Sequence, residues 1–315
     1  MKALLFENSI SIGKIPKPAR KDGESLIKVL LAGICNTDLE IVRGYMGFKG
    51  VLGHEFIGIV EDSENHSLIN KRVVSEINIG CGHCHFCING LKRHCPNRSV
   101  VGILNHQGAF AQYISIPDSN LFIIPDNVSD EQAVFVEPLA AALEIFEQVK
   151  IYPSSQVAIV GDGKLALLIL QVIQLTGCKC FLFGKHKEKL EIAAKFGAIT
   201  SFAKKGSSQK FDIVIESSGK KEGFTFALNI IKPRGTIILK STYQSNVSFN
   251  FAKIVIDEIH IIGSRCGPFE PAIFLLEKKF IQIDPLISKV FPFKDFIEAF
   301  TFAQKDNLKV LIDFK

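Results

Sequence analysis

Four cysteines form the densest group of metal-binding side chains in the sequence. They follow the pattern C-x2-C-x2-C-x7-C over residues 81–95, with a glycine directly after the first. Four thiolates gathered by one short loop complete the tetrahedral shell that Zn2+ prefers and leave no position open for a substrate. Without a metal, thiols so close together would be prone to oxidation. The spacing therefore predicts a structural zinc site formed by Cys81, Cys84, Cys87 and Cys95.

A second set of metal-binding side chains lies upstream, in two separate segments. Residues 35–38 read Cys-Asn-Thr-Asp, and residues 53–55 read Gly-His-Glu. Taken singly, Cys35 would more often be a small buried apolar residue and His54 a turn histidine. A cysteine and a histidine from different segments, with carboxylates close to both, are the donors of an open, catalytic zinc site. The combination therefore favours a metal.

A glycine-rich turn offers a third kind of chemistry. Residues 161–166 read G-D-G-K-L-A, directly after an apolar run and before a helical pattern. The first glycine permits a tight turn, the second lets a pyrophosphate approach the backbone, and the small last residue lets the helix pack on the sheet. This setting predicts a dinucleotide site. We assign to it Gly161, Gly163, Lys164, Leu165 and, after a later strand, Ser217.

The end of the second strand of this region bears on the choice of dinucleotide. An NAD enzyme normally carries Asp or Glu there for the ribose 2′-hydroxyl. Here Gly184 is followed by Lys185, His186 and Lys187. A missing carboxylate beside cations favours a 2′-phosphate, so the sequence predicts NADP(H) over NAD(H). The alternative interpretation is a solvated run of charges at the start of a helix.

Two kinds of sequence pattern indicate the elements that must position these residues. Short β-type runs broken by Gly, Pro and Asn fill the first 125 residues and predict an irregular, mostly antiparallel β domain. From Gln156 onward strands alternate with helices, which predicts an α/β, doubly wound parallel sheet of Rossmann type with helices on both faces. Between the two, Ser129 is the expected N-cap of a helix over Asp130–Val149.

The expected domain boundaries follow these two patterns. Residues 1–128 form the catalytic domain, with the cysteine loop at about 78–98 as a lobe, residues 129–268 form the cofactor domain, and residues 269–315 return to the first domain. Pro233 is expected to stop a helix over Glu222–Ile231. After Pro271 the pattern predicts one helix, Phe296–Gln304, and a final strand, Lys309–Phe314.

Composition excludes several classes of protein. The 315 residues carry a net charge of +5, but the Lys and Arg residues are scattered and lack interleaved aromatic residues, which argues against nucleic-acid binding. No apolar run approaches the roughly 20 residues of a membrane span, and the first residues lack a signal peptide. We therefore expect a cytoplasmic protein, in which eight cysteines are not a disulfide framework.

These motifs together resemble the zinc-containing medium-chain dehydrogenase/reductase superfamily, which includes alcohol, polyol and threonine dehydrogenases. The resemblance rests on residues 33–38, residues 53–55, the four-cysteine lobe, Val136-Glu137-Pro138 and the turn at Gly161. It implies a GroES-like catalytic domain in which Cys35 and His54 bind the catalytic zinc. Glu137 stands where ordinary alcohol dehydrogenases have a third, cysteine ligand. Glu55 either binds the zinc or stands behind it.

The resemblance also implies roles for nearby side chains. Thr37 corresponds to the hydroxyl that carries the alcohol proton, and Asp38 to the acceptor that holds the ring of His54. Many polyol-type relatives carry a histidine at the position of Glu40, so this carboxylate is a candidate for the proton path. Arg265 resembles a basic residue near the nicotinamide, although a surface arginine is an equal alternative. Tyr45 and Phe48 are the expected walls of the substrate site.

The sequence thus predicts a zinc-dependent alcohol or polyol dehydrogenase that uses NADP(H), holds one catalytic and one structural zinc ion, and acts on a small alcohol, aldehyde, polyol or ketose. Two alternatives stay open: an aldehyde dismutase-like zinc enzyme on the same scaffold, and a catalytically silent nucleotide-binding protein. The resemblance also implies a homodimer or homotetramer, with the strand Ile259–Gly263 as the candidate sheet edge for pairing.

Overall fold

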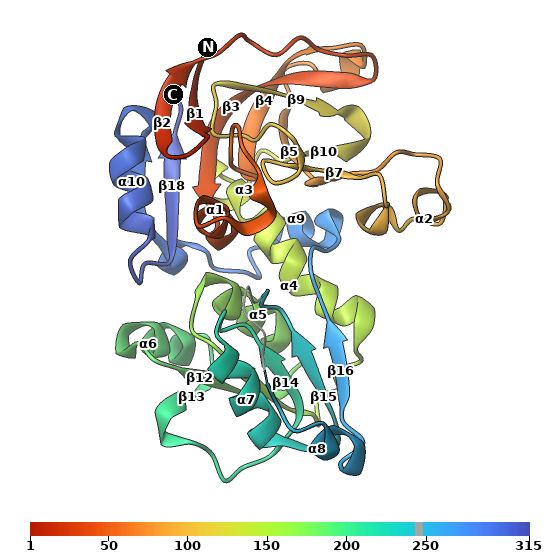
Figure 1. Cartoon of the computed structure of the whole chain (residues 1–315), viewed down its shortest axis with the longest axis vertical. Coiled ribbons are helices and arrows are strands. Elements are labelled where there is room, and N and C mark those ends of the chain that lie inside the picture. The colour runs from red at the N-terminus through yellow and green to blue at the C-terminus, as the bar shows by residue number, and fades with distance from the viewer. Residues whose placement is uncertain (243–247) are drawn as a thin grey trace. The chain divides into compact units, whose positions relative to one another are not determined.

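A computed structural model describes residues 1–242 and 248–315 of the chain. It divides into two compact units: unit 1 comprises Met1–Glu137 and Phe269–Lys315, and unit 2 comprises Pro138–Pro268. Both chain ends belong to unit 1 (Figure 1). The first boundary follows Glu137, whereas the sequence placed it after residue 128, so Glu137 belongs to the same unit as Cys35 and His54.

Unit 1 is built on a seven-stranded sheet in which all pairs except β17–β18 are antiparallel. The strand order is β10-β5-β4-β3-β18-β17, and β9 also pairs with β3. The last two strands of the chain thus complete a sheet whose other strands all come from the first 123 residues. The strands are β3 (Glu24–Ile34), β4 (Glu55–Ser63), β5 (Arg72–Ser75), β9 (Tyr113–Pro117), β10 (Leu121–Ile123), β17 (Ile287–Pro292) and β18 (Lys309–Asp313).

Small sheets and short helices complete unit 1. The hairpin β1 (Lys2–Phe6) and β2 (Ile10–Lys14) forms one small sheet, and β6 (Asn78–Ile79), β7 (Ser99–Val101) and β8 (Asn105–His106) form another. The α-helices are α1 (Asn36–Val42), α2 (His85–Ile88), α3 (Asp130–Val134), α9 (Phe269–Glu277) and α10 (Phe296–Ala303). The 310 turns are η1 (Tyr45–Gly47), η2 (His66–Leu68), η3 (Lys92–His94), η4 (Asp118–Asn120), η6 (Asp284–Leu286) and η7 (Phe293–Asp295).

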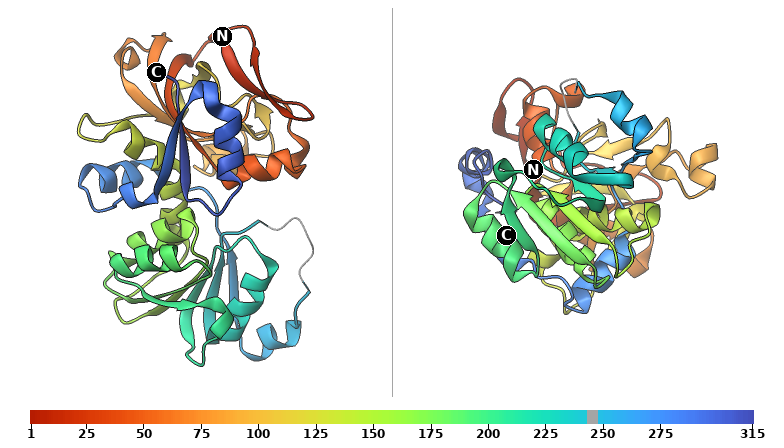
Figure 2. Two further views of the ribbon diagram at one scale, coloured as in Figure 1. Left: turned by 90° about the vertical axis from the view of Figure 1, so that its left-hand side faces the viewer. Right: turned by 90° about the horizontal axis from the view of Figure 1, so that it is seen from below.

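Unit 2 contains a six-stranded sheet that is parallel throughout. Its order is β13-β12-β11-β14-β15-β16, the order of a doubly wound dinucleotide-binding fold, so the predicted fold class is confirmed. Figure 2 shows helices on both sides of this sheet. The elements are α4 (Val136–Gln148), β11 (Gln156–Val160), α5 (Lys164–Gln174), β12 (Lys179–Gly184), α6 (Lys187–Lys195), β13 (Ile199–Phe202), η5 (Ala203–Lys205), β14 (Phe211–Glu216), α7 (Lys221–Ile230), β15 (Ile231–Leu239), α8 (Phe251–Ile256) and β16 (His260–Gly263).

Helix α3 begins where the sequence predicts. The Oγ of Ser129 accepts a hydrogen bond from the backbone N–H of Gln132, and the Gln132 side chain accepts one from the N–H of Ser129. This reciprocal capping fixes the start of the helix. The single helix expected over Asp130–Val149 is interrupted at Phe135 and continues as α4.

The helix expected over Glu222–Ile231 is α7, which ends at Ile230, before Pro233. Strand β15 begins directly after it, so Pro233 lies inside this strand, where the pairing with β14 shifts in register between Phe211 and Ile213. An irregularity of this kind tolerates a proline, which has no N–H to donate. The expectation of a single helix in the tail is wrong, because α9 precedes α10 there. Pro271 lies in the first turn of α9, where the missing N–H is not needed.

The part of the chain that the structure describes includes no helix long and apolar enough to cross a bilayer.

Candidate active site, cysteine lobe and cofactor turn

Strand pairing brings distant residues together at the end of β3. Gly33 lies opposite Glu55, the first residue of β4, and opposite Leu311 of β18, two residues after Lys309. A side chain at position 33 would collide with its neighbours, because a Cβ there would lie 2.8 Å from Glu55 Oε2 and 3.2 Å from Lys309 Cδ. Gly33 therefore leaves the space in which these two side chains meet.

Three potential ligands gather at this point, here called the mixed-donor cluster: Cys35, His54 and Glu55. Their donor atoms all lie within 4.8 Å of one another. Cys35 is the N-cap of α1, directly after β3, and Glu55 begins β4, so the two strands set the positions of all three residues. Sulfur, nitrogen and oxygen donors at this separation fit a Zn2+ ion, and three protein ligands leave a position for a substrate.

Asp38 ties the two segments of the mixed-donor cluster together. This fully buried carboxylate accepts hydrogen bonds from the backbone N–H of Cys35 at 2.8 Å and of Gly53 at 3.2 Å. Its Oδ1 also lies 3.4 Å from Nδ1 of His54, a buried nitrogen that has no hydrogen bond of good geometry. With Nδ1 facing Asp38, the other ring nitrogen is the one available to a metal.

The electrostatics of His54 follow from these neighbours. Burial lowers the pKa of the imidazole, but the nearby Asp38 and then Cys35 outweigh it and hold this pKa well above its usual range. The two acidic groups thus favour a positive charge beside them.

Glu55 has a partner that the sequence did not reveal. The Nζ of Lys309 forms an ion pair with Glu55 Oε2, and the two side chains are 0% and 1% exposed. The residues are 254 positions apart. Lys309 Nζ also lies 5.5 Å from the centre of the Phe135 ring. The one signal available beforehand was a lysine followed by three apolar residues at the start of the final strand.

Other predicted residues lie around this cluster rather than in it. The thiol of Cys35 lies 3.6 Å from Thr37 Oγ1. Glu40 forms an ion pair at 2.7 Å with Arg43, the C-cap residue of α1. Glu137 lies in the first turn of α4, half-buried, and is not one of the three side chains of the cluster.

The four predicted cysteines lie together in what we call the cysteine lobe, residues 78–98. Their sulfur atoms lie within 4.8 Å of one another. The backbone N–H of Cys81 donates to Cys95 Sγ at 3.5 Å, and Cys84 Sγ lies 3.7 Å from the same sulfur. Hydrogen bonds from backbone groups, that of His83 foremost, lower the pKa of Cys81 to about 6. This geometry is that of a closed four-thiolate shell.

The glycine-rich turn lies between β11 and α5, as the sequence predicts. Gly161 has a φ of +125°, and a Cβ there would approach the backbone of Ser217 at 2.9 Å. Ser217 N donates to the carbonyl of Val160 at 2.9 Å, which places the end of β14 directly beside the turn. Gly163 is the N-cap of α5 and has open space around it. The turn therefore presents backbone N–H groups and a helix N-terminus, as a pyrophosphate requires.

The residues predicted to select the dinucleotide lie at the end of β12. Gly184 is its last residue and is buried, and Lys187 begins α6. Lys185 is exposed and His186 half-buried. Arg265, which follows β16, is exposed and donates to the sulfur of Cys266 at 3.6 Å.

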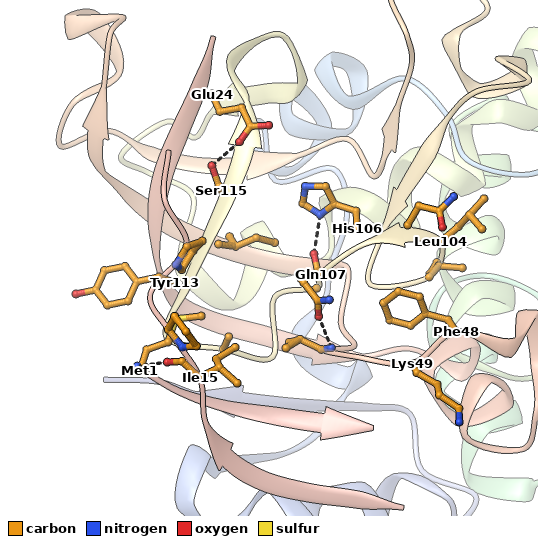
Figure 3. Close-up of a pocket in the computed structure, with 18 of the residues that line it drawn as sticks. Met1, Ile15, Glu24, Phe48, Lys49, Leu104, His106, Gln107, Tyr113 and Ser115 are labelled. Carbon is orange, nitrogen blue, oxygen red and sulfur yellow. Dashed lines mark hydrogen bonds between the residues drawn. The ribbon is translucent and has the colours of Figure 1, made fainter. Parts of the chain in front are cut away.

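A cavity of about 730 Å3 lies in unit 1 (Figure 3). Phe48, one of the two expected wall residues, lines it together with Met46, His106 and Tyr113, whereas Tyr45 does not. None of the three residues of the mixed-donor cluster belongs to its lining. The cavity and the metal-binding geometry are thus separate features of unit 1.

Comparison with known proteins agrees with this geometry. Residues 21–126 match the model of the alcohol dehydrogenase GroES-like domain, and residues 165–278 match that of the zinc-binding dehydrogenase domain. The chain is 30% identical to D-arabitol-phosphate dehydrogenase of Enterococcus avium, over 94% of this chain and 91% of the relative. The chain therefore belongs to the zinc-type medium-chain alcohol, polyol and threonine dehydrogenases, and it is an oxidoreductase acting on CH–OH donors.

Solved structures extend the comparison to the cofactor. An Escherichia coli CFT073 alcohol dehydrogenase complexed with NADH is 29% identical, with a TM-score of 0.90 over 100% of this chain and 99% of the other. A zinc-binding dehydrogenase of Sinorhizobium meliloti 1021 bound to NADP is 28% identical, with a TM-score of 0.91 over 99% and 98%. Proteins of this fold thus hold either dinucleotide.

Proposed function

We propose that the protein is a zinc-dependent alcohol or polyol dehydrogenase that prefers NADP(H) and carries two zinc ions. The mixed-donor cluster is the observation that carries this proposal. A cysteine sulfur, an imidazole and a carboxylate lie within 4.8 Å of one another, and buried charged partners support two of them. Such a donor set suits an open catalytic zinc site rather than a closed structural one.

Each residue of the cluster has a distinct task in this proposal. Cys35 and His54 would hold the ion, and Asp38 would fix the imidazole by its other nitrogen. Glu55 is the third candidate ligand because it lies within the cluster, while Glu137 remains the alternative from the start of α4. Lys309 compensates the charge of Glu55, which would otherwise stand buried and unpaired.

The chemistry requires a Lewis acid, a hydride carrier and a path for one proton. Bound zinc would polarise the substrate oxygen and the nicotinamide would exchange a hydride with the carbinol carbon. The hydroxyl of Thr37 is the group proposed to take up the alcohol proton, since its Oγ1 lies 3.6 Å from Cys35 Sγ. Glu40, held by Arg43, is a candidate for passing that proton to water.

The cofactor preference rests on the end of β12. Gly184 cannot accept a hydrogen bond from a ribose 2′-hydroxyl through a side chain, and three basic residues follow it. Lys187 is 81% exposed and only loosely paired with Glu191 at 3.8 Å. Exposed pairs of this kind contribute little stability, so Lys187 can turn to a phosphate. A 2′-phosphate is therefore the better fit.

The cysteine lobe would hold the second zinc ion, which would stabilise the folded loop rather than bind a substrate.

We further propose a homodimer or homotetramer. β16 is at the edge of the six-stranded sheet, and Phe251, Val255 and Ile256 of the preceding α8 are all at least 70% exposed. Light scattering would measure the mass, and a monomer would contradict this assembly.

The test is an NADPH-linked screen of alcohols, sugar alcohols and aldehydes on protein of measured zinc content. We expect two zinc ions per chain, activity that a chelator removes and zinc restores, and a clear preference for NADPH over NADH. Comparable turnover with both dinucleotides would contradict the cofactor preference. Full activity after removal of all zinc would contradict the metal mechanism. Copurification of a nucleotide that does not exchange would instead favour aldehyde dismutation.

A further inference from the structure

At the end of β12, the space that a side chain at position 184 would fill is occupied by a carboxylate from another segment. Asp162 is the middle residue of the glycine-rich turn, between Gly161 and Gly163. A Cβ at Gly184 would lie 2.6 Å from Asp162 Oδ2 and 2.7 Å from Asp162 Cβ. The Asp162 side chain thus occupies the space that a side chain at position 184 would need.

Asp162 is held by donors from the segment that follows Gly184. Its Oδ2 accepts hydrogen bonds from the backbone N–H of Lys185 at 2.6 Å and of His186 at 2.8 Å. The same carboxylate lies 3.0 and 3.2 Å from Nδ1 of His186. Burial raises the pKa of Asp162, but these backbone and imidazole donors lower it more, so the group stays ionised near neutral pH.

We propose that Asp162 and Gly184 act as one unit that selects the dinucleotide. Asp162 is a positioning residue: it fixes the backbone of Lys185 and His186 and one side of the imidazole, so that this segment can receive a 2′-phosphate. Because Gly184 has no side chain, it leaves space for Asp162 and offers no carboxylate to accept a hydrogen bond from a 2′-hydroxyl. This inference deepens the NADP(H) preference proposed above and rests on it.

Asp162 does not itself take the place of the usual ribose acceptor. The residue is 8% exposed, and Oδ2 already has three donor groups within 3.0 Å. A carboxylate oxygen has about two lone-pair sites, so a hydroxyl at Oδ2 would have to displace one of these donors, and Oδ1 faces the His186 imidazole at 3.2 Å. The carboxylate is thus used internally, and exposed Lys185 and Lys187 keep the rim of the site positive.

One consequence concerns the usual way of changing cofactor preference, which is to add an acid at the end of this strand. In this chain Gly184→Asp alone would force two carboxylates into one space and would break the hydrogen bonds of Asp162. We expect it to weaken binding of both dinucleotides rather than to exchange one for the other. Removing the Asp162 side chain at the same time makes the room, and the double variant should prefer NAD(H).

The test uses the full-length protein and two fragments that need no metal, 2′,5′-ADP and 5′-AMP, with affinities from calorimetry. In the wild type we expect 2′,5′-ADP to bind at least about tenfold more tightly, the value of one charge-assisted hydrogen bond. Asp162→Ala should reduce this ratio to within about threefold, with Asp162→Asn between. Gly184→Asp should weaken both fragments, and Asp162→Ala/Gly184→Asp should recover 5′-AMP binding and prefer it.

A matched control separates positioning from general stability. Asp212, at the start of β14, also accepts a backbone N–H, that of Gln156 at 2.8 Å, and pairs with Lys232 at 2.7 Å. Asp212→Asn should lower the melting temperature without changing the fragment ratio. An unchanged ratio in Asp162→Ala, or a double variant that binds no better than Gly184→Asp, would overturn the inference.

The two proposals can fail separately. If the wild type binds 5′-AMP as tightly as 2′,5′-ADP, the proposed NADP(H) preference fails, and with it the role of Asp162 in that preference. The comparison of single and double variants would still show whether positions 162 and 184 depend on each other. If the wild type prefers 2′,5′-ADP but the variants show no such dependence, only the inference about Asp162 fails.

Discussion

The two groups of potential metal ligands in unit 1 are built in opposite ways. The cysteine lobe draws four identical ligand atoms from one segment of fifteen residues, and they need little from the rest of the fold. The mixed-donor cluster draws three different atoms from two strand ends, and buried charges on Asp38 and Lys309 accompany it. In the proposed function, the site for folding is therefore local, whereas the site for chemistry is positioned by the whole sheet.

The largest effect should come from breaking the lobe. Cys84→Ser removes one thiolate of a closed shell, and structural zinc contributes on the order of 10 kcal/mol to the folding of small zinc domains. We expect this variant to lose one zinc ion and several kcal/mol of stability. Zinc analysis and thermal unfolding measure the two losses.

Breaking the mixed-donor cluster should instead abolish activity. Cys35→Ala removes a ligand from an open site, and we expect turnover to fall by at least about a thousandfold, since a Lewis acid supplies several kcal/mol of transition-state stabilisation. Binding of 2′,5′-ADP and the melting temperature should change little. Cys178→Ala, a buried cysteine outside both clusters, is the control. Retained turnover in Cys35→Ala would remove the zinc mechanism.

The next largest effect is expected on stability, from the buried ion pair between Lys309 and Glu55. Lys309→Met leaves the charge of Glu55 buried without a partner, which costs about 3–5 kcal/mol. The double variant Lys309→Met/Glu55→Gln removes both charges and should recover most of that loss. The activity of this stable double variant then tests the role of Glu55. If Glu55 is a zinc ligand, we expect the double variant to be inactive.

A surface pair calibrates this result. Lys232 and Asp212 lie 2.7 Å apart but are 37% and 42% exposed. Lys232→Met should cost no more than about 1 kcal/mol in the free energy of unfolding. If Lys309→Met cost as little, the buried pair with Glu55 would have no structural role.

The same contrast explains what could be predicted from sequence. The lobe, the glycine-rich turn and the parallel sheet are visible because their residues are close in sequence or repeat with a clear period. Lys309 could not be assigned, because its partner is 254 positions away and only the register of β18 on β3 brings them together. Likewise, the sequence showed that an acidic residue is missing at Gly184, but it did not show that the Asp162 side chain occupies the space beside it.

A smaller effect on the zinc site itself is expected from the support of the imidazole. Asp38→Asn keeps the size of the side chain but removes the charge that faces His54 Nδ1 at 3.4 Å. Losing such a partner typically weakens metal affinity or activity by roughly 10- to 100-fold. Zinc affinity measured by competition with a chelator should fall within this range, while the zinc ion of the lobe is unaffected.

Asp118 offers the control for this variant, because it is another carboxylate of unit 1 that accepts side-chain hydrogen bonds, from Ser25 and Ser63. Asp118→Asn should lower stability slightly and leave the affinity of both zinc ions unchanged. If Asp38→Asn behaved in the same way, Asp38 would only cap α1, and the assembly of the cluster would depend on the strands alone. A selective loss of one zinc ion would instead show that the buried charge holds His54 ready for the metal.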